Sequence, residues 1–158
     1  MDWERPFRKI EEKLQKEKEE RERKAKEQEE VIQKMKSASS CINFKGVLES
    51  FVKVLPLGAR WREDNHGLRF EIDSGRDDWR IRVDICLKRV PEWSEHYATV
   101  GRSYQIPLRA VTEKNLYVQV QKGWNLSDGY SDKLTINIPL KTITEEKLAS
   151  ALVEAYMA

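Results

Sequence analysis

One short stretch of this chain concentrates residue types that carry acid–base or metal chemistry. The sequence Glu92-Trp93-Ser94-Glu95-His96 places two carboxylates and an imidazole close together. A zinc ion that assists hydrolysis needs three fixed protein ligands and an open position. Asp64 and His66 would have to complete such a site from another loop, and spacing of this kind arises by chance in any charged loop. We therefore expect no metal site, no cofactor and no catalytic residue.

Other catalytic patterns are absent from the sequence. It contains neither a Gly-x-Ser-x-Gly nucleophile motif nor a Gly-rich phosphate loop. Its two cysteines, Cys41 and Cys86, are too few for a disulfide framework or a thiolate metal site, which favours a reducing compartment. No apolar leader and no membrane-spanning run is recognisable. We expect a non-enzymatic protein of the cytoplasm.

Aromatic residues gather in two predicted loops, 91–102 and 122–132. If six strands run antiparallel in sequence order, these loops and the 64–67 turn emerge at the same end of the sheet. Trp and Tyr dominate binding hot spots, so their presence there favours a partner-binding surface. The alternative, which the sequence leaves open, is that the two loop tryptophans fold back and close the core. The predicted partner-binding residues are Trp93, His96, Tyr97, Trp124 and Tyr130.

Basic residues outnumber acidic ones on the predicted polar face of the sheet. Such a face could track a phosphate backbone, with one tyrosine available to stack a base. Cross-strand pairs of Glu71 or Asp73 with Arg80 or Arg82 would absorb much of this charge, so we prefer a solvated, salt-bridged face. The residues that would bind nucleic acid in the alternative are Arg69, Arg80, Arg82, Lys88, Arg109, Tyr117 and Lys141.

The elements that position these residues are strands with one apolar face. Residues 68–73 and 79–88 alternate apolar and polar side chains on either side of the turn 74–77, which predicts a β-hairpin. The same alternation predicts strands at 60–63, 104–110, 116–121 and 133–141.

Two helices are expected to cover the apolar face of this sheet. Asn43 and Thr144 are typical helix caps, and each precedes an apolar stripe with helical spacing. The predicted fold class is α+β: an antiparallel sheet of about six strands with two helices on its apolar face, preceded by a long charged helix. A sheet closed around the C-terminal helix is the alternative.

The N-terminal segment predicts a continuous charged helix. Residues 6–36 contain no Gly and no further Pro, and many Glu residues lie four positions before a Lys or Arg. A heptad drawn from Phe7 to Met35 is apolar only at its ends. A lone helix is our preferred interpretation; a coiled-coil dimer and a partly ordered tail remain open. We divide the chain into a charged helix or weak coiled coil at 1–37 and an α+β domain at 38–158.

The charge balance points to no particular partner. The formal net charge is +2, from 29 basic and 27 acidic residues, so no whole-molecule field draws the protein to nucleic acid or membranes. We predict a small non-catalytic interaction protein, an adaptor, regulator or inhibitor, with a protein partner bound through the aromatic loops. Nucleic-acid binding through the basic face and the N-terminal helix is the alternative, and an enzyme or ligand pocket at the loop end comes third.

Overall fold

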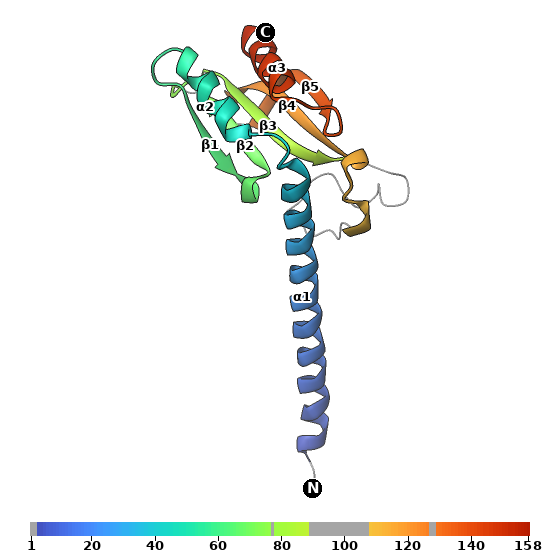
Figure 1. Ribbon diagram of the computed structural model, residues 1–158. Coiled ribbons are helices and arrows are strands. Elements are labelled where there is room, and N and C mark those ends of the chain that lie inside the picture. Colours follow the sequence, from blue (N-terminus) through green and yellow to red (C-terminus); the bar gives the residue numbers. More distant parts are fainter. Residues whose placement is uncertain (1–2, 77, 89–107, 127–128) are drawn as a thin grey trace.

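The computed structural model describes residues 3–76, 78–88, 108–126 and 129–158. Within these residues the chain forms three α-helices, five strands and three short 3-10 helices, in an α+β arrangement (Figure 1). Their order is α1 (Glu4–Ser39), α2 (Phe44–Val54), β1 (Arg60–Asp64), η1 (Asn65–Gly67), β2 (Arg69–Asp73), β3 (Arg80–Leu87), η2 (Leu108–Ala110), η3 (Glu113–Asn115), β4 (Leu116–Leu126), β5 (Gly129–Pro139) and α3 (Glu145–Met157).

The strands form one antiparallel sheet in the order β1-β2-β3-β4-β5. The predicted α+β fold class is confirmed. The predicted strand at 104–110 is wrong where it can be checked, because Leu108–Ala110 forms η2 and β3 pairs directly with β4. Tyr104 to Pro107 lie outside the described residues. Pro139 ends β5 at the edge of the sheet, where a missing backbone donor costs no ladder hydrogen bond.

Helices α2 and α3 cover the apolar face of the sheet (Figure 1). Both begin at the predicted caps: the Asn43 side chain accepts a hydrogen bond from the Gly46 amide, and Thr144 accepts one from the Lys147 amide. Phe44 of α2 stacks on Phe70 of β2, with ring centroids 5.6 Å apart. The apolar stripes at helical spacing therefore correspond to the faces that α2 and α3 bury.

Helix α1 is exposed over most of its length, and its C-terminal end is buried in the core. We call the exposed part, residues 3–27, the shaft. The whole helix contains 36 residues and is roughly 54 Å long. Every residue from 3 to 27 is exposed, and the shaft extends away from the rest of the molecule (Figure 1). Near its C-terminal end Val31, Ile32 and Met35 are buried in the same core as the sheet and the other helices. The last turns of α1 are therefore part of the α+β core.

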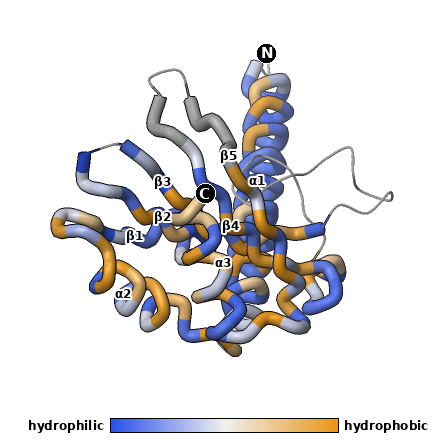
Figure 2. The backbone as a smooth tube through the Cα atoms, turned by 90° about the horizontal axis from the view of Figure 1, so that it is seen from above, coloured by the Kyte–Doolittle hydropathy of each residue, from blue (hydrophilic) through white to orange (hydrophobic). Residues whose placement is uncertain are grey.

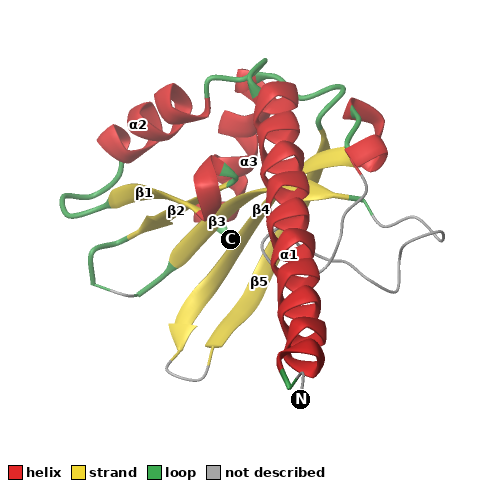
Figure 3. Cartoon of the chain, turned by 90° about the horizontal axis from the view of Figure 1, so that it is seen from below, coloured by secondary structure: helices red, strands yellow, loops and turns green. Residues whose placement is uncertain are grey.

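The connection at 122–132 is a β-hairpin end rather than a loop. Strand β4 runs to Leu126 and β5 begins at Gly129, and both extend past Gly123, the last β4 residue that pairs with β3 (Figure 3). Because no strand separates β3 from β4, this hairpin emerges at the opposite end of the sheet from η1. The expectation that the 122–132 connection and the 64–67 turn share one end is wrong for this reason.

Candidate interaction surfaces

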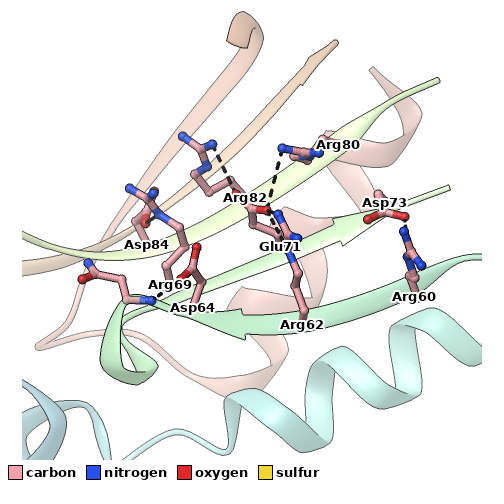
Figure 4. Close-up of polar contacts among 10 residues, drawn as sticks. Arg60, Arg62, Asp64, Arg69, Glu71, Asp73, Arg80, Arg82 and Asp84 are labelled. Carbon is pink, nitrogen blue, oxygen red and sulfur yellow. Dashed lines mark hydrogen bonds and ion pairs between the residues drawn. The ribbon is translucent and has the colours of Figure 1, made fainter. Parts of the chain in front are cut away.

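The polar face of the sheet is an ion-pair network centred on Glu71 (Figure 4). Arg82 lies directly opposite Glu71 in the β2–β3 register, 3.3 Å from Oε1, and Arg80 lies 3.8 Å from Oε2. Arg62 of β1 donates to Oε2 through both Nε, at 3.0 Å, and Nη2. Two further pairs, Arg60 with Asp73 and Arg69 with Asp84, flank this centre. The predicted salt-bridged face is confirmed.

In this network the acidic side chains are more buried than the arginine side chains that pair with them. The Glu71 and Asp73 side chains are only 4% and 8% exposed, whereas their partners Arg62 and Arg60 are 60% and 73% exposed. Burial by itself would raise the pKa of Glu71, but the hydrogen bond and charge of Arg62, together with the neighbouring arginines, hold that pKa below its ordinary value. An ionised Glu71 therefore fixes these guanidinium groups in place.

Burial is the largest cause of the pKa shifts of two neighbouring groups, the Asp84 carboxyl and the Cys86 thiol. It raises the pKa of Asp84 despite the hydrogen bond from Arg69. Burial, with the nearby Asp84 charge, raises the pKa of Cys86 to about 12. Since the thiolate is the nucleophilic form, we expect Cys86 to react slowly at neutral pH.

Of the other predicted nucleic-acid-binding residues, Tyr117 shares this face, because it pairs with Cys86 and lines a cavity of about 320 Å³ together with Arg69 and Arg82. Arg109 lies in η2, and Lys141 follows the end of β5 in a turn. Lys88 and Tyr117 line a cavity of about 740 Å³ together with Asn137 and Pro139, at the end of the sheet where β3 stops. The polar face thus unites Arg69, Arg80, Arg82 and Tyr117. Lys88, Arg109 and Lys141 lie outside it.

The predicted aromatic site is divided as well. Trp93, His96 and Tyr97 lie outside the described residues, as do Glu92 and Glu95 of the candidate metal site. Trp124 and Tyr130 belong to the projecting β4–β5 hairpin, where Trp124 pairs with Ser131 and Asn125 with Tyr130. Their side chains are not described, so partner binding by these residues stays a prediction.

His66 lies in η1, at the opposite end of the sheet from that hairpin, in a left-handed conformation with φ +56°. Within the ranges that the structure describes, no group of three or more His, Cys, Asp or Glu residues could hold a metal ion.

An exposed apolar stripe marks the N-terminal end of α1. Its members, at helical spacing, are 52–62% exposed, and the Trp3 and Phe7 rings make an edge-to-face contact at 5.8 Å. We call this set the tip stripe; it consists of Trp3, Phe7, Ile10 and Leu14. The predicted heptad contains Phe7, Ile10 and Leu14 at its apolar N-terminal end but not Trp3, and no binding site is predicted there.

A groove between α2 and α3 is the second apolar surface. Its volume is about 640 Å³, and its lining includes the exposed residues Val54 and Val153. Glu145 and Glu146 are among its lining residues, and the Asn43 side chain fills the space beside Gly46. We call it the α2–α3 groove; its apolar lining consists of Val47, Phe51, Val54, Ala149 and Val153. The helical stripes of the sequence indicated the buried faces of α2 and α3 but not the space left between them.

Comparisons with protein-family models, with curated proteins and with solved structures gave no match. Among the helices that the structure describes, none is long and apolar enough to cross a membrane.

Proposed function

We propose that this protein is a non-catalytic interaction protein that binds a protein partner through the tip stripe of α1. The observation that carries the proposal is the exposure of four large apolar side chains on one face of a helix that extends away from the core. Exposed apolar residues are ordinary when scattered, but a row at helical spacing is the arrangement that an amphipathic helix uses to dock on a partner.

The rest of the shaft supports this function. Residues 3–27 are all exposed, and i, i+4 ion pairs such as Arg23 with Glu27, at 3.5 Å, support the helix without tertiary contacts. The buried C-terminal turns of α1 hold the shaft in a fixed direction relative to the sheet. The tip stripe is therefore presented far from the core at little conformational cost on binding.

The test is affinity capture from cell lysate with nuclease treatment, comparing two matched variants. Phe7→Gln with Leu14→Gln removes half of the tip stripe, and Glu12→Gln with Lys16→Gln changes the opposite side of the same helix; both pairs leave the net charge unchanged. We expect partners retained by the wild type and the control to be lost from the stripe variant. Equal retention by all three would contradict the proposal.

The projecting β4–β5 hairpin is proposed as an additional contact. It is supported by the extension of this hairpin past Gly123, the last β4 residue that pairs with β3, and by the presence of Trp124 and Tyr130 in it. Replacing both residues by Ala should weaken capture of the same partner. The free energy of unfolding should change by only about 1 kcal/mol, which corresponds to a few degrees in melting temperature. A loss of folding would instead support the core-closing role.

Nucleic-acid binding is the second candidate function. It is favoured by the outward position of Arg60 and Arg62 above buried carboxylates, which gives the polar face a guanidinium surface. It predicts binding of single-stranded oligonucleotides that falls steeply with salt and weakens in Arg60→Gln with Arg62→Gln. The control is Lys53→Gln on α2. Binding that does not respond to salt would exclude this function.

A further inference from the structure

We infer that the outer edge of β5 pairs with the same edge of a second copy of this chain, in an antiparallel register centred on Ile136, so that the two sheets join into one. This inference goes beyond the proposed function, because it concerns a surface other than the tip stripe. β5 is the last strand of the sheet, and among the described residues no segment pairs with its outer side. Such an edge carries unpaired backbone donors and acceptors, which are a template for another strand.

The register with β4 shows which backbone groups of β5 point outward. Leu140 N donates to Leu116 O at 3.0 Å, so these two residues form a hydrogen-bonded pair. Hydrogen-bonded and non-hydrogen-bonded pairs alternate along an antiparallel ladder, so the even-numbered residues from 134 to 138 exchange hydrogen bonds with β4. The N–H and C=O groups of Thr135 and Asn137 therefore point to the outer edge.

The outer part of β5 has a stretch with no charge to oppose pairing. We call it the edge segment; it consists of Leu134, Thr135, Ile136, Asn137 and Ile138. Its two polar residues are exposed and its three apolar residues are only partly buried, whereas Val118 and Val120 on the neighbouring strand are 0% exposed. A further strand would therefore cover apolar surface that β5 leaves accessible to water.

The opposite edge of the sheet has a different character. β1 contains Arg60, Arg62, Glu63 and Asp64, and Figure 2 shows it as mostly hydrophilic, while hydrophobic positions recur along β5. Charged side chains on an edge strand resist pairing with another chain. A sheet joined through β5 would therefore end in β1 on both sides, and the assembly closes as a dimer.

Two features limit the pairing to one register. At one end of the edge segment the β4–β5 register shifts, because Leu134 pairs with Lys122 but Asp132 pairs with Gly123. At the other end Pro139 has no N–H to donate. An antiparallel pair that uses only the edge segment is therefore centred on Ile136.

In this register the edge segment is complementary to itself. Thr135 of each copy lies opposite Asn137 of the other, and each such pair exchanges two backbone hydrogen bonds. On the apolar face of the sheet, the two Ile136 side chains lie opposite each other, and Leu134 lies opposite Ile138. No like charges face each other within the segment, and apolar cross-strand pairs of this kind stabilise a ladder.

The dimer would present two tip stripes on one side. The two-fold axis is perpendicular to the joined sheet, so it keeps each face of the sheet on the same side in both copies. The shaft extends from the sheet away from α2 and α3 (Figure 1). Two shafts that extend to the same side can engage one partner surface together, which strengthens binding without a new kind of contact.

The test is sedimentation equilibrium of the full chain over a concentration series, with charges added to the edge segment. The wild type should rise from 18.6 kDa towards twice that mass. Thr135→Lys with Asn137→Lys places like charges opposite each other, as does Thr135→Glu with Asn137→Glu, so each variant should associate about tenfold or more weakly. An equimolar mixture should recover association, because every pair is then of opposite charge. Ser50→Lys with Ala149→Lys, at exposed positions of α2 and α3, is the control and should behave as the wild type.

Disulfide cross-linking tests the register. The Cα atoms of a non-hydrogen-bonded antiparallel pair are about 4.5 Å apart, which a disulfide can span. In a Cys41→Ser background, Ile136→Cys should give a covalent dimer on a non-reducing gel after treatment with oxidised glutathione. Leu134→Cys is the matched control, because its two copies would be about 13 Å apart along the strands and should not bond.

Three results would overturn the inference: a wild type that is monomeric at every concentration, a lysine variant that associates as strongly as the wild type, or equal cross-linking at positions 134 and 136. Self-association lost in Phe7→Gln with Leu14→Gln but kept in the edge variants would show that α1 joins the copies instead. Stripe-dependent capture of a partner from lysate would leave the proposed function standing in each of these cases.

Discussion

Lys122 of β4 donates hydrogen bonds from Nζ to the main-chain oxygen of Tyr156, at 2.9 Å, and to that of Ala158, at 2.8 Å. Lys122 is only 7% exposed and follows Val118 and Val120 on the apolar face of the strand. Its ammonium group therefore satisfies carbonyl groups at the C-terminal end of α3 that have no helical partner. The ammonium also lies 5.8 Å from the centre of the Tyr156 ring.

Replacing Lys122 by Met should destabilise the fold although Met packs well against apolar neighbours. The carbonyls of α3 would lose a charged donor, at a cost of about 2 kcal/mol, which corresponds to a fall in melting temperature of about 4–8 °C. Thermal unfolding followed by circular dichroism measures this. Lys141→Met, at an exposed turn position, is the control and should change the melting temperature little; equal effects would refute the capping role.

Glu71 should make stability depend on pH in the acid range. Its pKa is lowered in the folded state, so its contribution is present above its ordinary value of 4.5 and is lost as pH falls through the folded value. Glu71→Gln should unfold more easily than the wild type at neutral pH, by on the order of 2 kcal/mol. The difference in melting temperature between the two should shrink from about pH 5 downward.

Asp84 contributes to both proteins, and the variant lacks the Glu71 charge that helps to raise the pKa of Asp84. The raised pKa of Asp84 acts in the opposite sense, since protonation of that group in acid favours the folded state. Glu49→Gln on α2 is the control and should show no such convergence. A difference that stays constant from neutral pH to acid would mean that the ionised form of Glu71 is not what stabilises the network.

The two cysteines should differ in reactivity. Cys41 is exposed, whereas Cys86 is partly buried and its pKa of about 12 leaves a thiolate fraction of about 10⁻⁴ at pH 8. Alkylation of the native protein should modify one thiol quickly, and two in denaturant. Cys41→Ser should remove the fast reaction; rapid labelling of that variant would show that Cys86 is accessible and ionised.

The shaft and the buried turns of α1 should contribute unequally to stability. Met35 is fully buried, so Met35→Ala should cost about 3 kcal/mol and lower the melting temperature by about 6–12 °C. Phe7→Ala, at a side chain 52% exposed, should change it little. Deleting residues 1–24 should preserve the fold, whereas deleting 1–36 should not. Equal stability of the two truncations would show that the C-terminal turns of α1 are dispensable.

The local elements were predictable because their signals are local. Alternation marked the hairpin around residue 74, and the caps Asn43 and Thr144 marked two helix starts, since each depends only on neighbouring residues. The ion pair of Glu71 with Arg82 was also predictable, because a short turn fixes the register of adjacent strands. The charged helix followed from the lack of Gly and from paired charges four residues apart.

Tertiary structure decided which elements meet. Alternation at 104–110 resembles a strand, but Leu108–Ala110 forms η2 and the sheet closes β3 against β4, which places the 122–132 hairpin at the opposite end from His66. Periodicity shows which face an element buries but not which neighbour it selects, because strand pairing depends on contacts distant in sequence. The burial of Met35 and the α2–α3 groove are likewise products of packing between distant segments, and only the folded chain determines them.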